Sequence, residues 1–408
     1  MRMITEAPSL IDPAVVFNPY PALAWLRGND PVHWAPEAHA WILTRHADVT
    51  NAFRESRLSA DRAKVLVHIA LAGGDTSPVR DYLRIMNDMM LMKDGGEHHR
   101  LRVLGNRGFT PSALASWSPR VNRVIDDLLS RIPADGRFDI VADLAEPMPS
   151  TVIAEMFNIP ERDQHFFRTW ADDLARFFGG TLGNPAEDAL KANAAATSFE
   201  QYFLRLYDER KQKPGDDLMS LFLTAEETGK LSASEVVNQC QLILVAGHVT
   251  TIDQLANGVY ALLRHEGAWD RLVASPELVK PAVEEMIRFD PSITLIMRVA
   301  TEDLTLHGRE IKAGQLVFLA LAAANRDPAV IPNPEVFDVA RSPNKHIGFG
   351  VGPHQCLGMN LARMELEAAL RAMLKRFPTL KLDAERLPVR KCDSLIFRGF
   401  QRLPVRTA

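Results

Sequence analysis

The chain has 408 residues, and its content of 47% hydrophobic and 24% charged residues is enough to build a sizeable buried core. A formal net charge of −4 gives no overall basic field, so binding to nucleic acid or to an anionic membrane surface is not expected. The first residues lack the apolar run of a signal peptide, and no later stretch offers about twenty uninterrupted apolar residues. The sequence therefore predicts a cytoplasmic protein without a membrane anchor.

The N-terminal part of the chain predicts a small mixed lobe. An amphipathic pattern over residues 20–27 indicates a helix, and alternating apolar residues over 32–34 and 40–44 indicate two short strands. A later helix places His98 and Arg102 on one face, because they are four residues apart. Taken alone, side chains of this kind are most often solvated on the surface.

The middle of the chain, from about residue 110 to 275, has a mostly helical pattern with proline and glycine punctuation. Short strand-like runs return at 304–306 and 316–319, and residues 397–405 are expected to form a hairpin. Internal repeats and low-complexity linkers are absent from the sequence. We therefore expect a mainly α fold with a minor β part, in a single large domain over residues 1–408.

A long helix is predicted over residues 234–265, although its centre is poor helix material. Gly247 costs about 1 kcal/mol relative to alanine, and residues 249–252 are all β-branched. The hydroxyl of Thr250 can bond to the carbonyl of Ala246, which loosens the turn and leaves a groove where a diatomic ligand and water could sit. A local conflict of this kind inside a helix indicates a functional site.

The next helix carries Glu285 and Arg288 three residues apart on one face. Pairs of this kind are usually surface bridges worth about 0.2–0.5 kcal/mol, and the E-x-x-R pattern is common by chance. Its place in the chain is more informative, because Arg341 follows about fifty residues later and a cysteine loop comes shortly after.

That loop, residues 349–358, holds Cys356 in front of a strong helix pattern over 359–370. Gly350 and Gly352 allow the backbone to turn tightly and to approach a flat cofactor. The helix N-terminus is expected to stabilise a thiolate and to lower the pKa of Cys356. The loop is therefore suited to holding an anionic sulfur against a metal.

Two other readings of Cys356 are weighed against this one. The thiol could be a small buried hydrophobe, which is the usual role of a free cysteine, or a nucleophile with His354 as its base. The sequence shows no obvious residue to orient such a base. Cys240 and Cys392 lie far away and form no C-x-x-C, so neither a disulfide framework nor a zinc site is indicated.

The pattern F-G-x-G-x-H-x-C-x-G of residues 349–358 resembles the haem-ligand loop of the cytochromes P-450, the haem-thiolate monooxygenases. The resemblance extends from about residue 15 to the C-terminus, because the other motifs follow in the family's order. It implies a helix-rich triangular domain with haem b (iron protoporphyrin IX) between the Thr250 helix and the Cys356 loop. Cys356 would be the metal ligand.

The resemblance also assigns roles to the other motifs. Thr250 would be catalytic, holding the proton network that allows O–O cleavage, and Glu285, Arg288 and Arg341 would form a structural network behind the haem. The cofactor-binding residues would be His98, Arg102, Ala246, Gly247, Arg298, Phe349, His354 and Cys356. Of these, His98, Arg102, Arg298 and His354 would serve the haem propionates.

One position departs from the family pattern. The family commonly has Asp or Glu just before the threonine, and this chain has Val249. Proton delivery must then use water, a polar group of the substrate, or another side chain such as His248 or Asp253. The sequence does not choose among these routes.

The expected reaction is hydroxylation or epoxidation of a hydrophobic small molecule by O2, in secondary metabolism. A polyketide, terpenoid, peptide or fatty acid would fit equally well. Family topology implies a substrate pocket lined by Met90, Phe177, Phe178, Ile243, Ile293, Leu295, Leu395 and Ile396.

The lack of an anchor or fused reductase resembles soluble bacterial members, which receive electrons from a ferredoxin or flavodoxin and a separate reductase. Arg100, Arg107, Lys345 and Arg363 are expected to form a basic patch for an acidic partner. Two alternatives to the monooxygenase stay open, a peroxide-driven peroxygenase and a non-catalytic haem-binding sensor.

Overall fold

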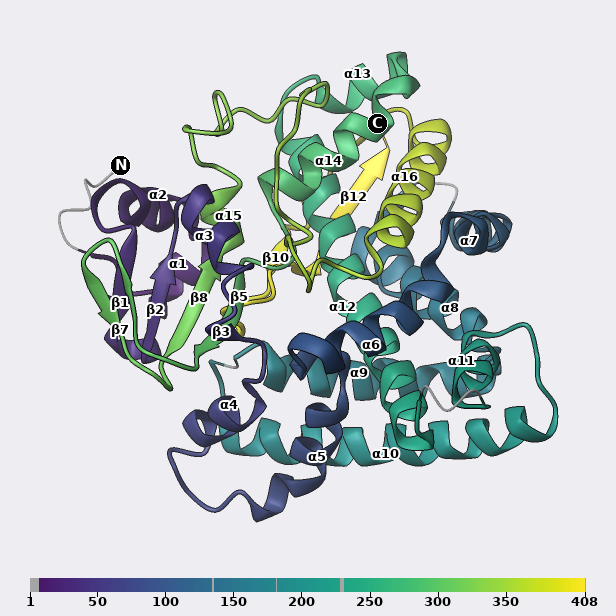
Figure 1. Cartoon of the computed structure of the whole chain (residues 1–408). Helices are drawn as coiled ribbons and strands as arrows, with labels where there is room; N and C mark the ends of the chain where they lie inside the picture. The colour runs from purple at the N-terminus through teal and green to yellow at the C-terminus, as the bar shows by residue number, and fades with distance from the viewer. Residues whose placement is uncertain (1–6, 134–135, 181, 228–230, 408) are drawn as a thin grey trace.

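The computed structural model describes residues 7–133, 136–180, 182–227 and 231–407. Helices fill most of the molecule, and a twisted sheet with its own small helices lies at one side (Figure 1). The helices are α1 Pro13–Phe17, α2 Tyr20–Asn29, α3 His46–Ala52, α4 Ala63–Ala70, α5 Arg80–Asp88, α6 Gly95–Gly105, α7 Pro111–Ser130, α8 Pro147–Met156, α9 Gln164–Phe178, α10 Pro185–Gln212, α11 Leu218–Glu227, α12 Ala233–Arg264, α13 Ala268–Ala274, α14 Val279–Phe289, α15 Leu321–Ala324 and α16 Met359–Arg376.

The strands are short, as expected for a minor β part. They are β1 Val32–Ala35, β2 Ala40–Leu43, β3 Leu58–Ser59, β4 Arg137–Asp139, β5 Leu295–Ala300, β6 Leu304–Leu306, β7 Arg309–Ile311, β8 Leu316–Ala320, β9 Leu380–Leu382, β10 Val389–Arg390, β11 Phe400–Arg402 and β12 Pro404–Thr407. The largest sheet has the order β1-β2-β8-β5-β3, in which β2 and β8 are parallel. This sheet brings β5 beside β3, although more than two hundred residues separate them.

The predicted helix over 234–265 is confirmed as α12, which crosses the centre of the molecule (Figure 1). It begins with a capping box, in which the Ser232 hydroxyl accepts from the Glu235 N–H and the Glu235 carboxylate accepts from the Ser232 N–H. Helices α8, α9 and α16 pack against it. Tertiary packing therefore stabilises a helix whose centre has low intrinsic propensity.

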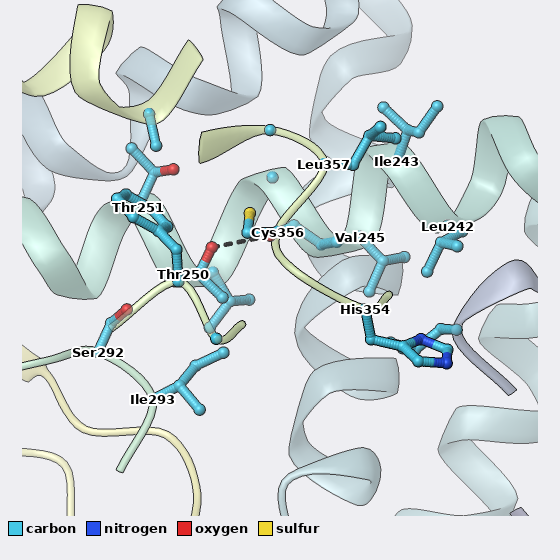
Figure 2. Close-up of a pocket in the computed structure, with 18 of the residues that line it drawn as sticks. Leu242, Ile243, Val245, Thr250, Thr251, Ser292, Ile293, His354, Cys356 and Leu357 are labelled. Carbon is cyan, nitrogen blue, oxygen red and sulfur yellow. Dashed lines mark hydrogen bonds between the residues drawn. The ribbon is translucent and has the colours of Figure 1, made fainter. Parts of the chain in front are cut away.

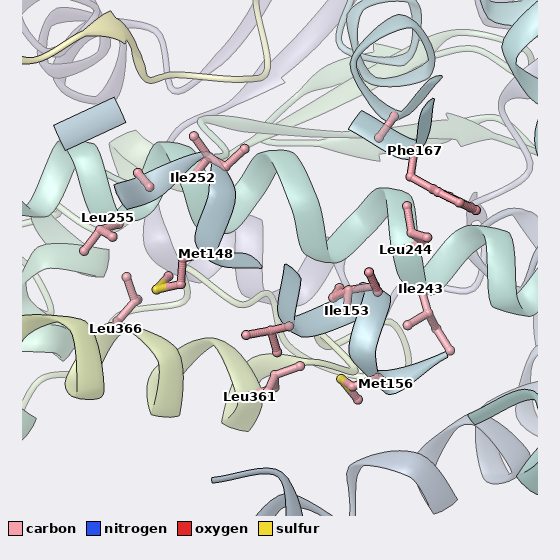
Figure 3. Packing of buried hydrophobic residues seen from close by; sticks show 14 of the residues in the cluster. Met148, Ile153, Met156, Phe167, Ile243, Leu244, Ile252, Leu255, Leu361 and Leu366 are labelled. Atoms are coloured by element: carbon pink, nitrogen blue, oxygen red, sulfur yellow. The ribbon is translucent and has the colours of Figure 1, made fainter. Parts of the chain in front are cut away.

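The main hydrophobic core lies where α8, α9, α12 and α16 meet (Figure 3). Each fully buried large aliphatic side chain contributes roughly 1.5–3 kcal/mol through apolar surface removed from water. The labelled side chains of this cluster are Met148, Ile153, Met156, Phe167, Ile243, Leu244, Ile252, Leu255, Leu361 and Leu366. This core fixes the distance between α12 and α16 and so sets the width of the space between them.

The predicted hairpin over 397–405 is wrong. β11 pairs with β10, whereas β12 pairs with β4 and β9 in a different sheet. The chain passes from one sheet to the other at Leu403, whose N–H donates to Asp139 at 3.1 Å. Residues 401–405, around Leu403, contain no glycine or asparagine to close a tight turn, and Pro404 lacks a ladder donor. β12 therefore pairs with the distant strands β4 and β9 and not with β11.

Among the described residues, no helix combines the length and the apolar character needed to cross a membrane.

Candidate active site

A cavity separates α12 from the loop that carries Cys356 (Figure 2). Its walls are mostly apolar, with polar groups restricted to a few positions. All eight residues that the sequence predicted to bind the cofactor line this cavity: His98, Arg102, Ala246, Gly247, Arg298, Phe349, His354 and Cys356. Thr250 lines it as well. The structure therefore brings together segments that lie up to about 260 residues apart in the chain.

The loop before α16 is held by its own backbone. The Cys356 N–H donates to the Phe349 carbonyl at 2.9 Å, and the Gly350 N–H donates to the Ile347 carbonyl at 2.8 Å. Gly350 and Gly352 have φ values of 66° and 78°, in the left-handed region that favours glycine. The glycines therefore allow the loop to bend back and to present Cys356 to the cavity.

The electrostatic environment of Cys356 differs from the one expected. Burial raises the pKa of its thiol, and the opposing effects of the Gly358 N–H and the cations Arg102 and Arg363 are smaller. The expectation of a lowered pKa from the helix terminus is therefore wrong for the thiol itself, because desolvation outweighs the dipole. A positive partner at the sulfur is needed to favour the thiolate.

The opposite wall is the disturbed centre of α12. The Thr250 Oγ1–H donates to the Ala246 carbonyl at 2.8 Å, as predicted (Figure 2). Ala246 is exposed to the cavity, although most of the helix is buried. Gly247 is required by packing, because a Cβ there would lie 2.2 Å from Ile153 Cδ1 on α8. The small residues thus open the groove on one side and allow close helix packing on the other.

The two side chains named as alternatives to the missing acid, His248 and Asp253, do not line the cavity. His248 is buried with its Nδ1 3.2 Å from the Ser150 hydroxyl, and burial lowers its pKa to about 3. Asp253 is buried too and forms an ion pair with Lys391 at 2.8 Å. Val249 itself lines the cavity. Neither His248 nor Asp253 therefore faces the space beside Thr250.

A group of cationic and imidazole side chains forms one end of the cavity. The rings of His98 and His354 lie 3.9 Å apart, and Asp94 is 3.5 Å from the His354 Nε2. Burial, followed by the charges of His354 and Arg102, lowers the pKa of His98 to about 4. Burial likewise lowers the pKa of Arg298 to about 10, which leaves it charged at neutral pH.

The hydrogen bonds of the predicted structural network are present, with Glu285 and Arg288 buried and Arg341 partly buried. Glu285 accepts from the Arg288 Nε at 2.7 Å and from the Arg341 Nε at 3.0 Å, and the side chains of Glu285 and Arg288 are 0% exposed. Asn344 Nδ2 and the Asp338 N–H also donate to the Glu285 carboxylate, at 3.1 and 2.9 Å. An E-x-x-R pair that usually lies on a surface is here a buried and fully bonded cluster.

The eight predicted substrate-pocket residues divide into two groups. Met90, Phe178, Ile243 and Ile293 line the cavity. Phe177, Leu295, Leu395 and Ile396 do not line it, and their assignment is corrected. Phe177 turns away and packs edge-on against Tyr82; Leu295 and Ile396 belong to the core beside the sheet; and Leu395, like Leu295, faces a smaller separate hollow.

The expected basic patch is partly neutralised. Arg100 pairs with Glu235, and Arg363 pairs with Glu284 at 2.7 Å. Arg363 also lies over the Phe349 ring at 4.7 Å, which ties it to the cysteine loop. Two of the four cations therefore have structural partners that the sequence reading did not foresee.

The sequence analysis did not predict two buried charged residues that line the cavity. Glu365 on α16 is 1% exposed, its Oε1 has no hydrogen-bond partner, and burial raises its pKa to about 8. Arg62, just before α4, is 2% exposed and also lines the cavity. In sequence each looks like a surface charge, and only the packing of distant elements buries it.

Comparison with known proteins gives the family. The model of the cytochrome P450 family matches residues 63–398. The vitamin D(3) 25-hydroxylase of Pseudonocardia autotrophica is 36% identical over 406 residues, covering 98% of this chain and 96% of the relative. The polyketide biosynthesis cytochrome P450 PksS of Bacillus subtilis is 34% identical over 396 residues, covering 95% of each. The crystal structure of CalO2 matches with a TM-score of 0.90 at 32% identity, over 98% of this chain and 99% of that one.

The chain therefore belongs to the cytochrome P450 family, and the protein is an oxidoreductase. The cavity fits a haem group. The two haem carboxylates need donors, and the His98 Nε2 is buried without a hydrogen-bond partner. Within the described part of the chain, no carboxylate lies at ion-pair distance from Arg102 or Arg298, so both cations are free to serve them.

Proposed function

We propose that the protein is a haem-thiolate monooxygenase that hydroxylates or epoxidises an apolar small molecule. The observation that carries the proposal is the placement of Cys356 and Thr250 on facing walls of one largely apolar cavity. The overall reaction consumes a C–H bond or alkene, O2, two electrons and two protons, and yields the oxygenated product and water. The relative PksS of Bacillus subtilis supports a role in secondary metabolism, since that protein is named for polyketide biosynthesis.

Bound haem would supply the redox chemistry, and a cysteine thiolate ligand favours cleavage of the O–O bond. Cys356 would provide that ligand. His98, Arg102, Arg298 and His354 would hold the two carboxylates, and the apolar walls would exclude water from the substrate side. We propose that electrons come from a ferredoxin or flavodoxin with a separate reductase.

Thr250 would orient the protons that the reaction consumes. We expect Thr250→Ala to lower product formation with NAD(P)H, ferredoxin and reductase by about 10²-fold, the low end of the range for positioned proton-transfer groups. Product formation driven by hydrogen peroxide should change little, because peroxide brings its own protons. The two rates are measured with the same substrate.

The matched control is Thr197→Ala on α10, which removes the same kind of helix bond, since Thr197 donates to the Asn193 carbonyl at 2.9 Å. This variant should keep both rates. A wild-type protein that forms product only with peroxide would establish the peroxygenase alternative, which Val249 favours by removing the usual acid.

Glu365 is the carboxyl that holds a proton beside the cavity at neutral pH. Burial raises its pKa to about 8, so the Glu365 carboxyl on α16 can donate a proton. Val249 on α12, which stands where the family commonly has an acid, has no proton to donate. We expect Glu365→Gln to slow NAD(P)H-driven turnover by about 10²-fold. We also expect wild-type activity to fall as pH rises through about 8, and this fall should be absent in Glu365→Gln. The neighbouring Glu367→Gln, which lies off the cavity wall, should change neither the rate nor the pH profile.

The same shift affects stability. The pKa of Glu365 is 4.5 in its unperturbed form and about 8 in the folded chain, so the folded state keeps a proton that the unfolded state loses. The stabilisation that Glu365 gives by keeping this proton is fully present below about pH 4.5. The free energy of unfolding then falls by up to about 1.4 kcal/mol per pH unit until about pH 8. Denaturant titrations at several pH values should show that the free energy of unfolding of Glu365→Gln falls less steeply with pH than that of the wild type. An unchanged slope would show that Glu365 keeps an ordinary pKa.

A further inference from the structure

Arg62 lies at the wall of the cavity between the sheet and the helices. It follows β3 and precedes α4, and its Nη1 donates to the Ala60 carbonyl at 2.6 Å and to the Leu91 carbonyl at 3.3 Å. Its guanidinium stands over the Phe178 ring, 5.2 Å from the ring centroid. The side chain therefore joins three segments of the cavity wall, and Leu91 and Phe178 line the same space.

Among the residues that the structure describes, the guanidinium of Arg62 has no anionic partner. Its Nε is buried without a hydrogen-bond partner, and no ion pair of Arg62 is found among the residues that the structure describes. Asp94 is engaged elsewhere, with the Ser59 hydroxyl, the Ala60 N–H and His354. Burial, followed by repulsion from Arg298, lowers the pKa of Arg62 to about 9, so the group is still a cation at neutral pH.

An unpaired buried charge is costly, because several kcal/mol of hydration are lost without compensation. Arg62 lies within electrostatic range of Arg298 and His354. For two haem carboxylates, Arg102 and Arg298 already supply two positive charges, and His98 and His354 supply further donors, so the charge of Arg62 is in excess of theirs. Arg62 is thus an additional positive charge at the edge of an apolar space. In the described part of the chain, both hydrogen bonds of the Arg62 side chain come from its Nη1. The edge formed by Nε and Nη2, which can bind a carboxylate side-on, is therefore available to a ligand.

We propose that Arg62 binds the carboxylate of the substrate, so that the protein acts on an apolar molecule carrying an acid group. The carboxylate sits against the guanidinium, flanked by Leu91 and Phe178, while the apolar body extends along the cavity wall toward Thr250. This inference rests on the proposed monooxygenase function and specifies its substrate class.

The test is a ligand titration of the ferric holoenzyme, followed by the change in the Soret band and repeated by calorimetry. The probes are dodecanoic acid and 1-dodecanol, which share the same chain. We expect the wild type to bind the acid at least about tenfold more tightly, and Arg62→Gln to weaken acid binding by roughly 10- to 100-fold, as for a lost hydrogen bond to a charged group. Binding of the alcohol should stay within about twofold.

Two further variants keep the test interpretable. Arg62→Lys retains the charge and should keep part of the preference for the acid, even if Arg62→Gln folds poorly. Arg27→Gln removes a half-buried arginine that donates to the Ala323 carbonyl at 2.9 Å, away from the cavity, and should leave both affinities unchanged.

Equal affinity of the wild type for the acid and the alcohol would overturn the inference. So would an Arg62→Gln variant that loses haem while binding both probes alike, because Arg62 would then serve the haem carboxylates. Failure of the proposed function looks different: the reduced carbon monoxide complex would lack the absorption band that gives the family its name, whichever probe binds. A normal absorption band of the carbon monoxide complex, together with equal binding of dodecanoic acid and 1-dodecanol, would reject only the role of Arg62.

Discussion

Replacing Cys356 with serine is expected to abolish monooxygenation and to remove the haem-thiolate absorption band of the reduced carbon monoxide complex. A serine hydroxyl has nearly the same shape, but it does not ionise to an electron-rich ligand at neutral pH. Haem content, the carbon monoxide spectrum and product formation should be measured on the same preparation. Product formation should fall to background, whereas the fold should be retained because the loop is held by backbone hydrogen bonds.

The other two cysteines provide matched controls. Cys392 is exposed, and Cys240 is fully buried within α12, where burial raises its pKa well above the ordinary value. Neither lines the cavity. Cys392→Ser and Cys240→Ala should therefore keep the absorption band, and a Cys356→Ser protein that also kept it would show that the iron ligand lies elsewhere.

The sequence predicted those parts of the fold and site that depend on local pattern. The periodicity over 234–265 and 359–370 led directly to α12 and α16, and glycine spacing located the cysteine loop. The bond from Thr250 to Ala246 also follows from local chemistry, because the two residues are one helical turn apart.

Partnerships between distant segments were not predictable in the same way. The expected hairpin over 397–405 failed because β12 pairs with β4, more than 260 residues away, rather than with its neighbour. Phe177 and Phe178 look equivalent in sequence. Both lie in the last turn of α9, but only Phe178 lines the cavity, because adjacent residues of a helix face different directions. Strand partners and helix orientation are properties of tertiary packing.

Burial of charge was the other source of error. Arg62 and Glu365 were passed over because charged side chains are usually solvated, and nothing in their own neighbourhood shows that several other segments enclose them. Glu285 and Arg288 were found only through the order of motifs, since their local pattern indicates a weak surface bridge. In the structure this pair is among the most enclosed polar groups of the chain.

That enclosure leads to a large expected effect on stability. We expect Glu285→Ala to lower the free energy of unfolding by about 3–5 kcal/mol, because it leaves Arg288 buried with an uncompensated charge. Arg341 would lose the same acceptor. Denaturant titration of the haem-loaded protein measures this loss, and Glu155→Ala, which breaks an exposed bridge to Arg123, should cost less than about 1 kcal/mol.

The damage should extend to the cysteine loop. Arg288 Nη1 donates to the carbonyls of Asn325 and Pro334, at 3.1 and 2.8 Å, and the Asn325 side chain accepts from the Ile347 N–H at 2.8 Å, two residues before Phe349. Loss of Glu285 releases Arg288 and so loosens the segment that leads into residues 349–358. We therefore expect Glu285→Ala to lose haem faster than Glu155→Ala. Equal stability and equal haem loss in the two variants would show that the buried network holds neither the fold nor the loop.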